Sequence, residues 1–313
     1  MGEATKIQWA DHTASPWHGC TKCAPGCENC YAEALSKRNP GTLGIWGDEG
    51  TRVKSKSFIK NLHKWQASAA KRGVTERVFP SLCDPFEDRP ELVPWREEMF
   101  DAIDECPNLI LMLLTKRPEN IRRMWPATGI EGHAGGCGHH KDYRPNVWLY
   151  TSVSEQATAD RNIPLLLQCR DLVPVLGVSA EPLLGPIDLD SGPRGGPPRW
   201  LTGEVDHGDP KLDHVIVGGE SGPHARPFDA MWADDLLRQC NAAGVPAFFK
   251  QFGSNPLTSN ANLHDWSDEQ LAAEASGTSA CSALLQFADN KGGLIEEWPE
   301  PLRVRQMPEV SHD

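Results

Sequence analysis

Four of the chain's ten cysteines fall within eleven residues near its N-terminus, so this segment is the strongest candidate for chemistry. It reads Gly19-Cys20-Thr-Lys-Cys23-Ala-Pro-Gly-Cys27-Glu-Asn-Cys30-Tyr31. Thiolates on a loop whose glycine and proline residues let the backbone wrap are typical ligands of an iron–sulfur cluster. In a reducing compartment such cysteines serve as thiols or metal ligands and do not form a disulfide framework. We therefore predict a metal centre at this loop.

The spacing of these cysteines fits two sets of three ligands. Cys23-x3-Cys27-x2-Cys30 is the commonest spacing of radical S-adenosylmethionine (SAM) enzymes, and Cys20-x6-Cys27-x2-Cys30 is a wider variant. In those enzymes three thiolates hold a [4Fe–4S] cluster, and one iron stays open for the cofactor SAM. The main alternative is a zinc site with the ligand pairs Cys20/Cys23 and Cys27/Cys30. A third interpretation is a set of free thiols.

The elements that must position this loop alternate between apolar and helical segments. We expect strands at Ile7–Trp9, Arg77–Leu82, Leu109–Leu114, Val147–Val153, Val173–Val178, His214–Val217 and Pro246–Lys250. Helical patterns lie between them, at Cys30–Arg38, Ser57–Arg72, Pro90–Glu105, Pro118–Trp125, Glu155–Gln168 and Asp229–Ala243. Several strands are apolar without alternation, as expected for parallel strands that are buried on both faces.

Alternating strands and helices predict βαβ units and a parallel sheet, hence an α/β protein. We expect a full or partial (β/α) barrel over residues 1–253, and a doubly wound open sheet is the second choice. Two Gly-rich segments, near 125–145 and 188–213, are expected to be insertion loops on the barrel rim. Residues 254–313 are expected to form a C-terminal extension that packs on the barrel and contains a short helix at Ser267–Ala275.

Polar residues follow almost every predicted strand. They are Asp84, Thr115, Lys116, Arg117, Ser152, Ser154, Glu155, Ser179, Glu181, Gly218, Gly219, Glu220, Ser221, Lys250 and Gln251. In a (β/α) barrel all these strand ends lie on one face, where active sites form. We expect most of them to share one pocket with the cysteine loop. The alternative is that they are separate caps and surface ion pairs.

The chemistry of SAM suggests roles for part of this set. Carboxylates suit the ammonium and ribose groups of SAM, a basic side chain suits its carboxylate, and paired glycines let the backbone approach a ligand closely. The predicted cofactor contacts are Lys116, Ser154, Glu155, Glu181, Gly218, Gly219, Glu220 and Lys250. A further cluster, His133-x3-Cys137-x-His139-His140, is interpreted as a solvated loop, with a second metal site as the alternative.

Charge and hydropathy exclude some classes of protein. The net charge of −12 argues against a protein that coats DNA through its phosphates, although a local basic groove on an acidic body stays compatible with a nucleic-acid substrate. No apolar run approaches the roughly 18 residues that span a membrane. The N-terminus lacks a basic start followed by an apolar stretch, so we expect a cytoplasmic protein.

Several phrases of the sequence resemble a known family. They are SPWHGCTKCAPGCENCYAE, LLTKRPENI, VWLYTSVSEQ, SAEPLLGPIDL, VIVGGESGPHARP, VPAFFKQFG and KGGLIEEWPEPLRVR. Together they resemble the phage-encoded radical-SAM-like family with a three-cysteine signature, from about Ile7 to Arg305. The resemblance implies a radical SAM barrel distantly similar to spore photoproduct lyase. It also implies the wide ligand set Cys20, Cys27 and Cys30, whereas Cys23 stands where the family has an aliphatic residue.

The same resemblance implies an activity. Some phage radical SAM proteins are thought to act in thymidine hypermodification, where they rearrange an amino acid attached to a thymine methyl group. The expected cofactors are therefore a [4Fe–4S] cluster and SAM. The expected partners are a modified DNA base or nucleotide and an electron donor such as flavodoxin or ferredoxin, in the host cytoplasm. The competing hypothesis is a zinc-stabilised nucleic-acid-binding or adaptor protein without catalysis.

Overall fold

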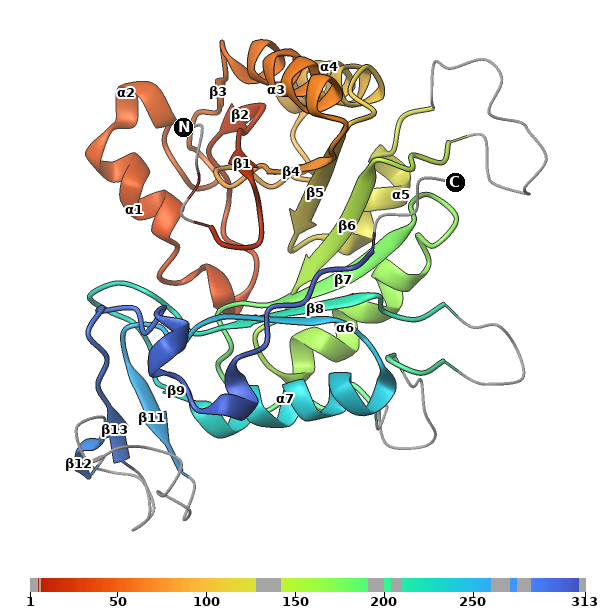
Figure 1. Ribbon diagram of the computed structural model, residues 1–313. Helices are drawn as coiled ribbons and strands as arrows, with labels where there is room; N and C mark the ends of the chain where they lie inside the picture. Colours follow the sequence, from red (N-terminus) through yellow and green to blue (C-terminus); the bar gives the residue numbers. More distant parts are fainter. Residues whose placement is uncertain are drawn as a thin grey trace. The chain divides into compact units, whose positions relative to one another are not determined.

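The computed structural model describes residue 5 and residues 7–127, 142–190, 200–203, 210–259, 271–274 and 283–309. Its main element is a seven-stranded sheet in the order β1-β4-β5-β6-β7-β8-β10 (Figure 1). The strands are β1 (His12–Thr13), β4 (Glu76–Phe79), β5 (Leu109–Thr115), β6 (Val147–Ser152), β7 (Val175–Ala180), β8 (His214–Gly218) and β10 (Ala247–Gln251). The pairs β1–β4, β4–β5, β5–β6 and β8–β10 are parallel.

The strand order confirms an α/β fold and decides between the two expected architectures. Spatial order follows chain order throughout, as in a (β/α) barrel, whereas a doubly wound sheet reverses its order at a switch point. Over the described ranges the sheet order starts at β1 and ends at β10 without closing. The sheet is therefore that of a partial barrel.

The described helices are α1 (Tyr31–Arg38), α2 (Pro40–Leu43), α3 (Phe58–Arg72), α4 (Val93–Asp104), α5 (Ile121–Met124), α6 (Gln156–Leu167) and α7 (Ala230–Ala243). The short α2 is not predicted, but the other six of these seven described helices fall within segments that the sequence predicts as helical. Helix α3 shows why: Phe58, Leu62, Trp65 and Ala69 recur at helical spacing and are buried. It ends at Gly73, whose positive φ of 65° a glycine adopts without strain.

Short elements complete the described fold. Single 3-10 turns lie at Pro25–Cys27, Pro90–Leu92, Pro118–Asn120, Ile295–Glu297 and Glu300–Leu302. A two-stranded sheet joins β2 (Trp17–His18) to β3 (Val53–Lys54). A four-stranded sheet has the order β12 (Leu271–Glu274), β13 (Ala283–Leu285), β11 (Pro256–Thr258) and β9 (Phe228–Asp229).

Two predicted elements are wrong. Ile7–Trp9 is not a strand: the Ala10 N–H donates to the Ile7 carbonyl and closes a turn, and the sheet starts later, where His12 pairs with Val78. The predicted helix Ser267–Ala275 is contradicted by its described part, since Leu271–Glu274 forms β12 and pairs antiparallel with β13. Sheet pairing overrides the helical propensity there. Residues 128–141, 191–199 and 204–209, within the expected insertion loops, lie outside the described residues, as does the His133–His140 cluster.

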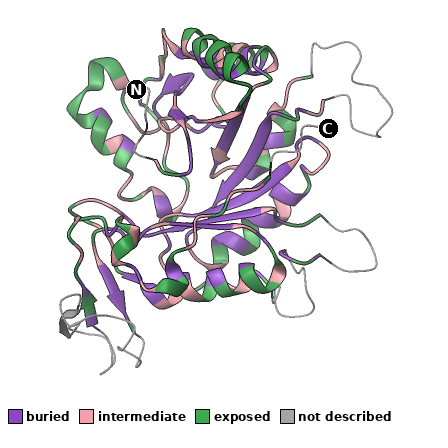
Figure 2. Cartoon of the chain, viewed as in Figure 1, coloured by how far each residue is buried: buried purple, intermediate pink, exposed green. Residues whose placement is uncertain are grey.

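Burial explains the unbroken apolar runs. Leu109–Leu113 of β5 and all of β6 are buried, and the strands are coloured almost entirely as buried in Figure 2, while helices such as α7 alternate buried and exposed residues. A strand that is covered on both faces has no reason to alternate polar and apolar side chains.

The chain divides into two compact units. One comprises residues 1–151 and 162–177 and carries the cysteine loop, and the other comprises residues 152–161 and 178–313. In the second unit the C-terminal segment lies along β10, where Phe249 N–H donates to Val304 O (2.8 Å) and Gln306 N–H donates to Ala247 O (2.8 Å). This segment satisfies the backbone groups that an edge strand leaves open. No helix in the described part of the chain is long and apolar enough to cross a membrane.

Candidate functional site

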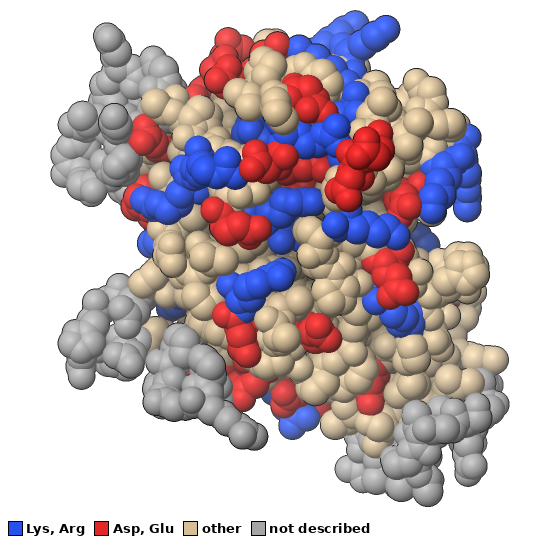
Figure 3. All heavy atoms as spheres, turned by 180° about the vertical axis from the view of Figure 1, so that it is seen from behind, with Lys and Arg blue, Asp and Glu red and all other residues tan. Residues whose placement is uncertain are grey.

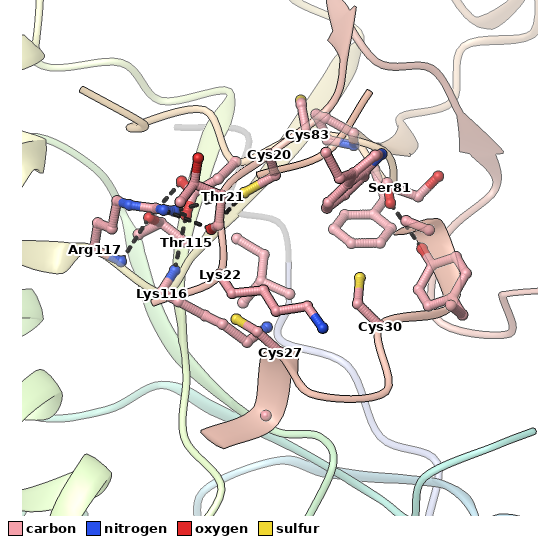
Figure 4. Close-up of a pocket in the computed structure, with 18 residues that line it drawn as sticks. Cys20, Thr21, Lys22, Cys27, Cys30, Ser81, Cys83, Thr115, Lys116 and Arg117 are labelled. Carbon is pink, nitrogen blue, oxygen red and sulfur yellow. Dashed lines mark hydrogen bonds and ion pairs between the residues drawn. The ribbon is translucent and has the colours of Figure 1, made fainter. Parts of the chain in front are cut away.

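A cavity of about 120 Å³ lies within the first unit, between the cysteine loop and the ends of two parallel strands. Cys20, Cys27 and Cys30 line it, and Figure 4 shows their sulfur atoms around the same space. The other lining residues include Lys22, Cys83, Asp84, Thr115, Lys116 and Arg117. Of the four loop cysteines, all of them described, Cys23 alone is missing from the lining. It is exposed, and its sulfur lies 3.9 Å from the Lys116 carbonyl oxygen.

The loop is fixed on both sides of Cys20. The Thr21 N–H donates to Glu87 Oε1 (2.9 Å), and Arg52 Nη2 donates to Thr21 Oγ1 (2.8 Å). Arg52 and Glu87 pair with each other at 2.6 Å, with side chains 0% and 3% exposed. Before them, Gly19 has φ +107°, and a Cβ there would lie 2.9 Å from Arg52 Cδ. Cys20 is therefore held rigidly, whereas Cys23 lies on the exposed part of the loop.

Three thiols of the loop have shifted pKa values. A hydrogen bond from Cys23, aided by the Lys116 charge, lowers the pKa of Cys27 to about 5. The pKa of Cys23 is raised, because its S–H donates to the Cys27 sulfur and because it is partly buried. Burial, together with Asp84 and Glu87, raises the pKa of Cys20 to about 12. Metal binding at Cys20 must therefore release a proton.

The donor set fits a thiolate-bound metal. Soft sulfur ligands select iron–sulfur clusters or zinc, and three cysteines around one cavity supply the ligands that a [4Fe–4S] cluster with one open iron needs. Within the described ranges, no three His, Cys, Asp or Glu side chains already lie close enough to share one ion. In a [4Fe–4S] cluster each cysteine binds a different iron, so the three sulfur atoms need not converge on one ion.

A second polar cluster lies within the other unit. It contains four residues of the predicted strand-end set, Ser179, Glu181, Gly218 and Lys250. Lys250 Nζ donates to Glu181 Oε1 (2.8 Å), and Ser179 Oγ donates to Glu181 Oε2 (3.5 Å). A Cβ at Gly218 would lie 2.7 Å from Glu181 Oε1. A glycine at this position therefore leaves room for the carboxylate beside β8.

The remaining predicted residues make contacts within their own unit. Glu220 accepts hydrogen bonds from the Arg226 side chain (2.6 and 3.0 Å) and backbone (2.9 Å), which closes the loop after β8. The Ser154 and Glu155 N–H groups both donate to Thr158 Oγ1 and thereby shape the start of α6. Ser154 is buried, and Glu155 is half-buried. Contact of these residues with a cofactor stays a prediction.

Gly219 is expected to be intolerant of substitution. A Cβ at Gly219 would overlap the Phe252 carbonyl oxygen, which is backbone and cannot swing away. We expect Gly219→Ala to lower the free energy of unfolding by about 1–3 kcal/mol. Gly41→Ala is the control, because no atom lies within 4 Å of a Cβ at that helical position. Urea denaturation of both variants is the measurement, and equal stabilities would contradict the close approach.

The fold and the cavity define an α/β protein with a thiol-lined site at the ends of parallel strands. Its residues 4–281 match the family model described as "Protein of unknown function (DUF5131)", and the chain belongs to this family. Comparison with curated proteins gives no significant match.

Solved structures of spore photoproduct lyase are similar to the chain. A point mutant has 10% identity and a TM-score of 0.43, with 96% of this chain and 74% of the other covered. A mutant with bound AdoMet and dinucleoside spore photoproduct has 10% identity and a TM-score of 0.39, with 91% and 71% covered. A complex with dinucleoside spore photoproduct has 10% identity, a TM-score of 0.39 and the same coverage.

Sequence reasoning found the cysteines, Lys116 and Arg117 but missed three cavity or support residues. Cys83 lines the cavity, yet it is a lone cysteine in the segment after β4 without a spacing partner. Arg52 and Glu87 lie 35 positions apart and carry no motif. Their pairing is a long-range contact, so only the structure reveals that they hold the loop.

Proposed function

We propose that the chain is a radical SAM enzyme whose cluster is held by Cys20, Cys27 and Cys30. The observation that supports this most is that these three cysteines line one cavity, while the fourth loop cysteine, Cys23, is exposed and is not among the lining residues. A [4Fe–4S] cluster with one open iron supplies the coordination site and the electron for reductive cleavage of SAM. The chain's own residues would bind and orient SAM and the substrate, and they would keep water out of the site.

We assign separate tasks to the predicted cofactor contacts, each within its own unit. Lys116 lines the cavity and carries the charge that suits the carboxylate of SAM. Glu181, held by Lys250, and the neighbouring Gly218 suit the ammonium or ribose group of the cofactor. Ser154, Glu155, Gly219 and Glu220 stay predicted contacts of the cofactor.

For the substrate we propose thymidine that carries an amino acid on the methyl group of its base. The enzyme would rearrange this amino acid during phage DNA hypermodification within the host cytoplasm. Acidic and basic side chains intermingle on the face that Figure 3 shows, and the net charge is −12. Such a face offers no single basic surface for a long phosphate backbone. This supports recognition of one base or nucleotide, which would be flipped out if it lies in a duplex. The electron donor is a flavodoxin or ferredoxin.

Anaerobic purification tests the proposal. We expect brown protein with about four iron and four sulfide per chain. After chemical reduction it should cleave SAM to methionine and 5′-deoxyadenosine. Colourless protein with about one zinc per chain would replace the proposal with a zinc-stabilised binding protein. Incubation with DNA or nucleosides that carry aminoacyl-thymidine, followed by mass analysis, tests the substrate.

A further inference from the structure

Arg117 reaches the cysteine loop from the end of β5. Its Nη1 lies 3.6 Å from Cys20 Sγ and 2.8 Å from Asp84 Oδ2, and its Nη2 lies 2.7 Å from the Thr21 carbonyl oxygen. The guanidinium thus donates to a sulfur, a carboxylate and a carbonyl at the same time, as the dashed lines of Figure 4 show in part. Its side chain is only 11% exposed.

Asp84 fixes the guanidinium from behind. Its Oδ1 accepts from Thr115 Oγ1 (2.6 Å) and from the Phe86 N–H (3.0 Å), and its Oδ2 accepts from the Lys116 N–H (3.2 Å). The Asp84 side chain is 7% exposed. Because Thr115 and Lys116 at the end of β5 and the Phe86 N–H hold this carboxylate, Asp84 anchors Arg117 from outside the cysteine loop.

These contacts separate Arg117 from Lys116, its neighbour in the cavity. Arg117 donates to three acceptors of its own chain, and two of them, the Cys20 sulfur and the Thr21 carbonyl oxygen, belong to the cysteine loop. A lysine could not replace it, because a single ammonium lacks the planar fork that reaches three acceptors in fixed directions. The sulfur that Arg117 contacts belongs to Cys20, one of the three proposed ligands.

We propose that Arg117 is a positioning residue that donates a hydrogen bond to the Cys20 sulfur and thereby raises the reduction potential of the bound cluster. This inference rests on the proposed function. Hydrogen bonds to cluster sulfurs and nearby positive charge stabilise the more negative, reduced state. The step that they favour is transfer of one electron from the reduced flavodoxin or ferredoxin, which is oxidised by one electron, to the cluster.

The test is a potentiometric titration of the reconstituted protein followed by electron paramagnetic resonance. We expect Arg117→Gln to lower the ratio of reduced to oxidised cluster at a fixed potential at least tenfold, which is a shift of about 59 mV for one electron. Arg117→Lys should lie between this variant and the wild type. Arg123→Gln is the control, since it removes the same charge from an exposed residue that pairs with Asp88. It should change the ratio less than twofold.

A second variant tests the inference when Arg117→Gln fails to assemble a cluster. Asp84→Asn removes the carboxylate that holds Arg117 beside Cys20. We expect the guanidinium to leave the sulfur and the ratio of reduced to oxidised cluster to fall, whereas loss of the negative charge alone would raise this ratio. Full iron content with an unchanged or raised ratio in both Arg117→Gln and Asp84→Asn would overturn the inference. So would an unchanged or raised ratio in Asp84→Asn alone when Arg117→Gln binds no iron. Absence of iron from the wild type would instead refute the proposed function, and this inference with it.

Discussion

Replacing Cys20 by alanine is expected to abolish cluster assembly, whereas Cys23→Ala leaves it nearly intact. Cys20 is a cavity-lining residue on the fixed part of the loop, next to Thr21, which accepts hydrogen bonds from two arginines and donates one to Glu87. Cys23 is exposed and outside the lining. Anaerobic iron and sulfide analysis, followed by measurement of SAM cleavage, checks this prediction.

Matched variants on the same loop make the experiment decisive. Cys27→Ala and Cys30→Ala should also abolish iron binding, because each of these residues belongs to both possible sets of three ligands. Cys23→Ala is the control for thiol loss without ligand loss. It also removes the S–H that donates to Cys27, so the pKa of Cys27 should rise. Loss of the cluster in Cys23→Ala, with retention in Cys20→Ala, would reverse the ligand assignment. Loss of zinc in all four variants would indicate a four-cysteine zinc site.

The sequence predicts the parts of this fold that depend on local pattern. Leu109–Leu113 is apolar without interruption because it is buried on both faces, and it is a strand. The sequence Phe58–Arg72 places its apolar residues at helical spacing, and it is a helix. Elements of two to four residues escape this reasoning, because their conformation depends on distant partners. His12 is in a strand because Val78 lies beside it, and Leu271 because β13 does.

The residues of the candidate site also differ in how far the sequence alone predicts them. The cysteines are predictable, because their spacing along the chain itself carries the ligand pattern. Arg117 and Asp84 are predictable as polar residues at strand ends, but the contact of Arg117 with the Cys20 sulfur is not. The support by Arg52 and Glu87 leaves no trace in the sequence, since an arginine and a glutamate are ordinary surface residues in any composition.

That buried pair gives the largest expected effect on stability. Glu87→Ala leaves the Arg52 guanidinium without its carboxylate partner, in a place where its side chain is 0% exposed. Removing one partner of a buried ion pair costs about 3–5 kcal/mol. We therefore expect a decrease of this size in the free energy of unfolding, measured by urea denaturation. Glu87 also accepts a hydrogen bond from the Thr21 N–H. The variant should therefore fail to assemble a cluster under conditions in which it is still folded.

Glu98→Ala is the matched control for this prediction. Glu98 pairs with Lys54, but both side chains are more than 40% exposed, at 45% and 43%. Exposed ion pairs contribute less than about 1 kcal/mol, so this variant should unfold like the wild type. A Glu87→Leu, Arg52→Met double variant should recover part of the stability, because apolar groups remove the unpaired charge. Recovery should stay incomplete, since Arg52 also donates to the carbonyl oxygens of Ile45, Gly47 and Gly50. Equal stability of Glu87→Ala and Glu98→Ala would show that the pair does not hold the loop.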